Sequence, residues 1–577
     1  MTDATLVAPP GNRRIDVTSD KARARIKARY RAEARFRSYG LIAVALTAAF
    51  LLVLIIDILT KGFPAFYQHG LVLDVPVAAD LVDEKSRTDA AAIRAADYYP
   101  STKAALDAAI PGIESRGAQR QLQRLLSSGA ADELRELLVQ DPSLIGKTVK
   151  ARLLLSDDAD LYFKGEGTRI LSRPARGIAT PSGTTGEITI LTSANDFADD
   201  LVEAKKELSE RAAELIAQAG RIERRSGPGG APRAKELREE AAGYQARVDQ
   251  PKVAEDLDSR MPSKLVAING GLVKVTKLED VRITGEVLLP LSSDAEAQPG
   301  SWQIVTYATP ESDRKVVDQE VAFLERLEEK GLVESAFNWR FFTHGDSREP
   351  EQAGILGAVV GSALMLFVTL ALCLPVGVMA AIYLEEFAPK NRITDLIEVN
   401  INNLAAVPSI VFGLLGLAVF LNFFGLPRSA PLVGGLVLAL MSLPTIIIAA
   451  RAAVRAVPPS IKEAALGVGA SHQQAIFHHV LPLAMPGIMT GTIIAMAQAL
   501  GETAPLLMIG MVAFIVDIPS GFTSAATVLP VQIYLWSDLP EAAFQAKTAG
   551  AIIILLLFLF GMNGMAIWLR KRFERRW

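Results

Sequence analysis

Six long stretches without charged residues constrain this chain more than any other feature of its sequence. They cover residues 39–56, 352–384, 399–427, 429–450, 480–501 and 548–569. A helix crosses the ~30 Å hydrocarbon core of a bilayer in about 20 residues. The sequence therefore predicts an α-helical polytopic membrane protein with six transmembrane helices. Charged residues still make up 21% of the 577 residues, so long segments between the spans must be exposed to water.

The Lys and Arg residues predict which loops face the cytoplasm, because cytoplasmic loops are enriched in both. The segment 1–38, which we treat as a separate cytoplasmic segment before a first transmembrane helix at 39–61, carries ten basic residues. We interpret this span as an uncleaved membrane anchor and not as a secretory signal peptide. Six crossings place both ends on one side, and the tail is also basic, with Arg570, Lys571, Arg572, Arg575 and Arg576. Both termini are predicted to be cytoplasmic.

One short loop fits this topology poorly. The predicted cytoplasmic loop 385–398 contains Lys390 and Arg392 but four acidic residues: Glu385, Glu386, Asp395 and Glu398. Acidic residues contribute little to the rule, so the cytoplasmic assignment is kept.

Residues 62–351 must then form an extracytoplasmic domain. Alternating apolar and polar residues around Gly270 and Gly271 predict strands, and heptad-spaced apolar residues predict an antiparallel helical hairpin at about 194–254, giving an inserted α+β domain. The hairpin could dock a partner or pack on its own domain. His69 and His344 are isolated, and neither a nucleophile elbow nor clustered metal ligands occur, so the sequence indicates neither an enzyme nor a metal site. The single cysteine, Cys373, is predicted to be buried in a span.

The stretch EAALGVGASHQQAIFHHVLP, residues 463–482, lies in the predicted cytoplasmic loop between the fourth and fifth spans. Its small residues and terminal Leu-Pro predict a short helix, a glycine turn, a second helix and a proline-marked entry into the next span. Its histidines, His472, His478 and His479, lack the further ligands that a metal site needs and are expected to be interface or surface residues.

The same stretch resembles the EAA loop of permease subunits in binding-protein-dependent ABC importers, which docks on a separate ATPase subunit. The resemblance assigns ATPase coupling to the matching positions, although His479 stands where an aliphatic residue is usual. No phosphate-binding G-x-x-x-x-G-K-[ST] loop occurs, so the chain is expected to bind no cofactor, with ATP used by a partner subunit. The matching positions are Glu463, Ala464, Ala465, Gly469, Leu481 and Pro482.

Three further stretches, AIYLEEFAPKNR, INNLAAVPSIVFGLLGLAVF and AQALGETAPLL, make residues 352–577 similar to PstA-type permeases of phosphate importers. The resemblance implies a type I ABC importer permease core with five of the spans, in the bacterial inner membrane. It also implies a second, PstC-type permease, a PstB-type ATPase dimer, an extracytoplasmic phosphate-binding protein and membrane lipid as partners. No nucleic acid is expected.

Glu502 is the only charged residue between positions 480 and 516, and an ionisable residue inside a span is a functional hypothesis by default. Gly501 and Pro505 are expected to open the backbone beside it. Phosphate near neutral pH retains a proton to donate to this carboxylate, whereas sulfate does not. In the family an Arg usually precedes this Glu by four residues, and here the position is Gln498. Thr503, Asn402 and Asn403 complete the predicted pathway. Adjacent residues cannot share one helix face, so one of the two asparagines is expected to face the bundle interior, where it lines the pathway or forms interhelical contacts.

Two other functions remain open on the sequence alone. The permease could carry another oxyanion, such as sulfate or molybdate. The outer domain could also be a sensor or scaffold for which the spans are a modified anchor, although an anchor needs no ATPase-docking loop.

Overall fold

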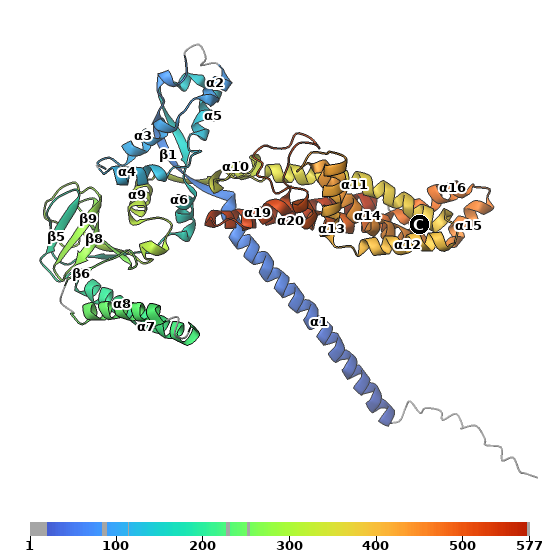
Figure 1. Ribbon diagram of the computed structural model, residues 1–577, viewed down its shortest axis with the longest axis horizontal. Helices are drawn as coiled ribbons and strands as arrows, with labels where there is room; N and C mark the ends of the chain where they lie inside the picture. Colours follow the sequence, from blue (N-terminus) through green and yellow to red (C-terminus); the bar gives the residue numbers. More distant parts are fainter. Residues whose placement is uncertain (1–19, 84–88, 114, 227–230, 251–253, 574–577) are drawn as a thin grey trace, which may run out of the picture.

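The computed structural model describes residues 20–83, 89–113, 115–226, 231–250 and 254–573. Figure 1 shows a helical bundle joined end to end with an α+β domain, and a first helix that leaves their junction and diverges from the bundle. The basic residues Arg13, Arg14, Arg575 and Arg576, used above to predict topology, lie outside the described residues.

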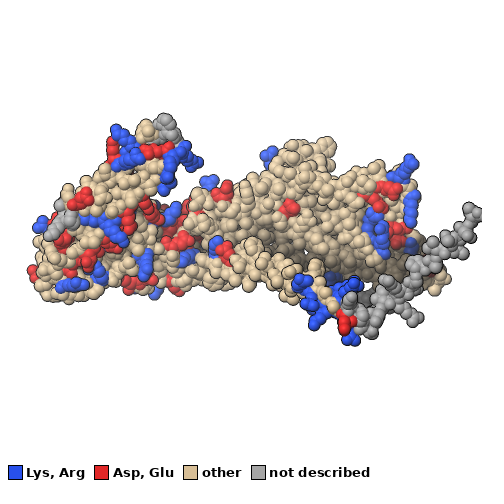
Figure 2. Space-filling view, turned by 90° about the horizontal axis from the view of Figure 1, so that it is seen from below, with Lys and Arg blue, Asp and Glu red and all other residues tan. Residues whose placement is uncertain are grey.

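Five of the described helices are long and apolar enough to cross a membrane, or six if one bent pair counts as a span. The predicted polytopic helical fold is confirmed. Figure 2 shows a band along the bundle that is nearly free of charged residues, with charges gathered at both ends. The five helices are α1 (Asp20–Gly62), α11 (Leu356–Ile382), α14 (Pro431–Arg455), α17 (Leu481–Gly501) and α20 (Ala542–Phe573).

The predicted span over 399–427 is a bent pair of helices and counts as one span only if the two pieces are taken together. The segment is divided into α12 (Arg392–Ala405) and a second piece, α13 (Ser409–Gly416) continued by the π-helical η10 (Leu417–Phe423). The two pieces meet at an angle of 99°. Pro408 explains the break, because proline lacks the N–H that continues a helix and disfavours helical geometry in the residue before it.

Small residues let the bundle helices approach closely, as is usual between membrane helices. A Cβ added to Gly435 of α14 would meet Val368 of α11 at 2.5 Å, and one added to Gly491 of α17 would meet Ala449 of α14 at 2.2 Å. Cys373 is 1% exposed in this core, as predicted. Helix α1 touches the bundle only near its end, where Gly62 lies against Ala549 and Ile553 of α20.

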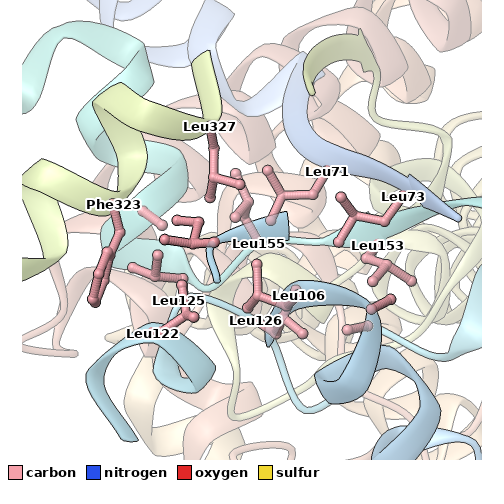
Figure 3. Close-up of a cluster of buried hydrophobic side chains, with 14 of the residues drawn as sticks. Leu71, Leu73, Leu106, Leu122, Leu125, Leu126, Leu153, Leu155, Phe323 and Leu327 are labelled. Atoms are coloured by element: carbon pink, nitrogen blue, oxygen red, sulfur yellow. The ribbon is translucent and has the colours of Figure 1, made fainter. Parts of the chain in front are cut away.

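The outer domain contains two sheets. The smaller has the order β11-β1-β2, so that β1 (Tyr67–Pro76) lies between β2 (Thr148–Leu154) and β11 (Val333–Phe337) and pairs antiparallel with both. Leu71 and Leu73 of β1 point into a leucine-rich core with the helices around them (Figure 3). These helices are α2 (Ala90–Ala95), α3 (Tyr99–Ala109), α4 (Arg116–Arg124), α5 (Asp132–Gln140), α6 (Asp157–Leu161) and α9 (Asp318–Glu329).

The larger sheet has the order β3-β10-β7-β8-β9-β5-β4, with β6 paired to β8. The turn predicted at Gly270 and Gly271 is shifted by one residue, because Asn269 and Gly270 have positive φ angles of 47° and 71° while Gly271 begins β8. The helical hairpin consists of α7 (Ala198–Ser226) and α8 (Ala231–Val248). The strands are β3 (Ile170–Pro174), β4 (Ala179–Pro181), β5 (Glu187–Thr192), β6 (Glu255–Asp256), β7 (Ser263–Ile268), β8 (Gly271–Leu278), β9 (Arg282–Leu289) and β10 (Gln303–Tyr307).

We expect the fragment 67–353 to fold by itself and the shorter fragment 80–340 to fail, because only the longer one contains β1. Leu71, Leu73 and Val75 of this strand are at most 4% exposed, and burying such side chains contributes about 1.5–3 kcal/mol each. Their loss is comparable with the ~5–15 kcal/mol stability of a whole domain. Gel filtration and urea unfolding of the two fragments test this, and equal cooperativity in both would contradict it.

The outer domain packs directly on the bundle. Phe341 of α10 (Trp339–Thr343) shares a buried cluster with Trp536 of α19 (Leu529–Ser537) and Phe544 of α20. Lys547 Nζ donates to the carbonyl oxygen of Ala353 at 2.7 Å. The domain is therefore seated on α19 and α20 and is more than a tethered appendage.

Glu351 lies at this junction, and its surroundings predict that the stability of the folded protein depends on pH. Its side chain accepts a hydrogen bond from Ser127 Oγ, its Oε2 atom is buried without a partner among the described residues, and burial raises the pKa of the carboxyl to about 7. A pKa raised in the folded state contributes stability at low pH that is lost as the pH rises from about 4.5 to about 7, up to about 3 kcal/mol.

The melting temperature of the purified chain should therefore fall between pH 5 and pH 8, and Glu351→Gln should flatten this dependence, because the amide fills the same space without titrating. Part of the slope should remain, since burial also raises the pKa of Asp157. Tryptophan fluorescence on heating measures both profiles, and identical slopes in the two proteins would contradict the assignment. Exposed Glu214→Gln on α7, away from this junction, is the matched control.

Candidate coupling loop and translocation route

The loop 463–482 has the local structure that its sequence predicts. Helix α15 (Pro459–Gly467) ends before Gly469, whose φ angle of 94° lies in the left-handed region. Helix α16 (His472–Ala475) then starts at a capping box formed by Ser471 and Gln474, and the π-helical η11 (Ile476–Val480) leads directly into α17. Such a left-handed position favours glycine, which has no Cβ to clash with the backbone.

An apolar inner face seats this loop on the bundle. Ala465, Ile476 and Val480 are buried, and the last two share a cluster with Ile382 of α11 and Val454 of α14. Among the residues assigned to ATPase coupling, Ala465 is therefore turned inward, and Leu481 and Pro482 are half-buried at the start of α17. Their place in the motif fits a role in shaping the loop.

The outer face of the loop is open and partly apolar. Glu463 and Ala464 are exposed, together with Leu466, Val468 and Phe477. Val468 is 87% exposed. Exposed apolar residues that are grouped on a rigid turn are typical of a docking surface.

The three histidines of the loop have different surroundings. His472 lies 3.1 Å from the carbonyl oxygen of Glu386, measured from Nε2, and its ring packs edge-on against Phe387. His478 and His479 are exposed. Within the described part of the chain, no group of three or more His, Cys, Asp or Glu residues could hold a metal ion.

A cluster of ion pairs, which the sequence analysis missed, fixes the base of the loop. Arg451 Nη2 lies 2.6 Å from Glu398 Oε1, Arg455 Nε lies 2.8 Å from Glu385 Oε1, and Lys462 pairs with Glu386. The acidic excess of the loop 385–398 is thus balanced by the basic residues at 451–462. That unexplained excess was the signal that could have revealed the cluster.

The helix break expected around Glu502 is present. Helix α17 ends at Gly501, Glu502 has an extended backbone with φ of −80° and ψ of 123°, and the short helix α18 (Ala504–Met508) begins after Thr503. The Glu502 side chain is half-buried, and its carboxylate has no hydrogen bond or ion pair with any residue that the structure describes. A carboxylate without a partner beside an interrupted membrane helix is available to a ligand.

The structure brings only some of the predicted pathway residues together. Gln498 is exposed one helical turn before Glu502, and Thr503 follows Glu502 directly. Asn402 and Asn403 are both exposed on α12, before the bend, and neither amide contacts another described side chain. Neither asparagine is buried within this chain alone, so their place in the pathway stays a prediction.

The part of α17 that leads to Glu502 presents an open face. Ile494, Gln498 and Gly501 follow one another at helical spacing and are all exposed. This chain alone therefore does not enclose the Glu502 carboxylate on that face.

Part of this chain matches a known family of transport proteins. The family described as binding-protein-dependent transport system inner membrane component matches residues 373–576, and a domain of unknown function, DUF3333, matches residues 23–173. The probable ABC transporter permease YqgI of Bacillus subtilis is 30% identical over 41% of this chain and 84% of its own length. Phosphate transport system permease protein PstA 1 of Mycobacterium tuberculosis is also 30% identical, over 41% of this chain and 77% of its own length.

One solved structure with a similar fold is an inward-facing form of the MetNI methionine ABC transporter. The match includes 38% of this chain and 95% of the transporter chain, with 16% identity and a TM-score of 0.30.

The chain is thus a multi-pass membrane permease of the ABC importer class and not an enzyme. Within that class it belongs to the PstA-type permease family. The curated relatives cover about two fifths of this chain, so they give no account of most of the outer domain.

Proposed function

We propose that this chain is one of two permease subunits of an ATP-driven phosphate importer, and that Glu502 lines the route of the anion. The observation that carries this proposal is the half-buried carboxylate at the end of α17, which has no partner among the described residues. The similarity to relatives named as phosphate permeases supports the choice of anion.

Hydrogen phosphate and dihydrogen phosphate carry O–H groups that can donate to the Glu502 carboxylate. Sulfate at neutral pH has no proton to donate, so the same carboxylate would repel it without compensation. A second permease of PstC type would cover the open face at Gln498 and Gly501 and supply the positive charge that this chain lacks at position 498. A soluble phosphate-binding protein would deliver the anion from the extracytoplasmic side.

The exposed face of the loop 463–482 is proposed to dock on a PstB-type ATPase dimer. This assignment, the basic ends of the chain and the pairing of the loop 385–398 with residues 451–462 all support cytoplasmic termini in a bacterial inner membrane. Residues 62–351 would then lie outside the cell membrane, where they would meet the delivered substrate.

Transport assays test the substrate. Deletion of this chain in its own host should abolish high-affinity uptake of labelled phosphate, and expression of the intact chain should restore it. Excess sulfate or molybdate should leave the restored uptake unchanged. Competition by sulfate as strong as that by unlabelled phosphate would instead make the protein a permease for another oxyanion.

A further inference from the structure

The helical hairpin of the outer domain divides into two parts of opposite charge. Residues 198–211, here called the hairpin base, contain five acidic and three basic residues. Residues 221–225 and 231–239, here called the hairpin tip, contain six basic and three acidic residues. A rigid helical pair thus separates a negative end from a positive end.

Buried ion pairs fasten the hairpin base to the larger sheet. Lys205 Nζ lies 3.2 Å from Glu255 Oε2 and also donates to the carbonyl oxygen of Arg247. Lys264 Nζ lies 3.1 Å from Asp200 Oδ1. The side chains of Lys205, Glu255, Lys264 and Asp200 are all less than 9% exposed, so buried ion pairs fasten the hairpin base to the sheet.

The positive charge of the hairpin tip remains available. Arg221 and Arg225 are exposed and form no ion pair or hydrogen bond with any residue that the structure describes. The pairs of Arg233 with Glu236 and of Lys235 with Glu239 are 61–78% exposed, and exposed pairs of this kind are weak and easily exchanged. The tip therefore carries a net positive charge toward solvent.

The direction in which the hairpin runs shows which surface lies near the positive charge of the hairpin tip. Helices α7 and α8 leave the larger sheet near β6 and run back toward the level at which α1 and α20 meet the outer domain, on the same side of the bundle as α1 (Figure 1). That level is where the apolar segments of α1 and α20 begin, and so where the bilayer surface lies.

We propose that the hairpin tip binds the membrane surface through anionic phospholipid head groups. Clustered Arg and Lys residues held within a Debye length of an anionic bilayer are attracted to it, and the attraction weakens with salt. Such a contact would make the hairpin a strut that holds the outer domain at a fixed height above the bilayer. The inference is independent of which anion the permease carries.

Fluorescence quenching in nanodiscs tests the contact with the full chain. In a Cys373→Ala background, single cysteines at Ala231→Cys in the tip and Ala242→Cys further along the same helix place a dye at two exposed positions that are about 16 Å apart. Spin-labelled lipid head groups quench a dye that touches the surface. We expect quenching at position 231, but not 242, to rise about twofold when phosphatidylglycerol replaces half of the phosphatidylcholine, and to fall in high salt.

Variants with fewer charges test whether the arginines of the hairpin tip cause this quenching. The triple change Arg221→Gln, Arg224→Gln and Arg225→Gln should remove the dependence on phosphatidylglycerol, whereas Arg116→Gln, Arg120→Gln and Arg124→Gln on exposed positions of α4 should leave it intact. Equal quenching at both dye positions, or no response to phosphatidylglycerol, would overturn the proposal. A response at position 231 only to an added extracytoplasmic binding protein would also overturn it and make the tip a protein-docking surface.

Discussion

Replacing Gly469 by valine should reduce phosphate uptake about tenfold or more while the protein remains in the membrane, because a non-glycine residue in a strained backbone region costs about 1–3 kcal/mol. The Gly469 φ angle of 94° lies where β-branched side chains are rare. The loop would relax by moving α15 relative to α16, which displaces the surface formed by Glu463, Leu466 and Val468. Coupling to the ATPase should fail first, since the apolar inner face still anchors the loop on the bundle.

Two comparisons separate backbone strain from side-chain bulk at this turn. No atom lies within 4 Å of a Cβ built on either Gly467 or Gly469, but only Gly469 has a positive φ. Gly467→Ala should therefore retain uptake, and Gly469→Asn should retain more than Gly469→Val, because asparagine tolerates left-handed geometry. Uptake and ATPase co-purification are measured at matched protein abundance. Wild-type values for Gly469→Val would show that the turn does not transmit coupling.

Changing Glu502 to glutamine should lower the preference for phosphate over sulfate by about tenfold, since a hydrogen bond to a charged acceptor is worth about 1–2 kcal/mol more than a bond to a neutral one. The amide keeps the size and one acceptor oxygen of the carboxylate. It also adds N–H groups, which can donate hydrogen bonds to sulfate. The variant should still fold, because a neutral amide is less costly to bury than an unpaired carboxylate.

Uptake of labelled phosphate with sulfate as competitor measures this preference. The matched control is Glu541→Gln, the same change at an exposed position just before α20. Gln498→Arg restores the charge usual in the family one turn before Glu502, and we expect it to raise phosphate affinity in the wild-type background but less so beside Glu502→Gln. Full transport with unchanged selectivity in Glu502→Gln would make the carboxylate a structural residue.

The sequence by itself determined the features that depend on local chemistry. Uncharged runs of about 20 residues predict membrane helices, because the backbone groups of a segment in lipid must be hydrogen-bonded within that segment. The glycine turn at Gly469 and the break between Gly501 and Pro505 also follow from residues a few positions apart. The class of the outer domain followed from its alternating and heptad patterns, which reflect the periods of strands and helices.

Tertiary structure decided everything that depends on residues distant in the chain. The acidic loop 385–398 pairs with Arg451, Arg455 and Lys462, and no local pattern encodes that pairing. The 99° bend at Pro408 is not fixed by proline alone, because Pro375 and Pro444 lie within continuous helices. The strand β1 belongs to the outer domain because its partners, β2 and β11, lie about 80 and about 270 residues further along the chain, and long-range pairing of this kind is set by the packing of the whole domain.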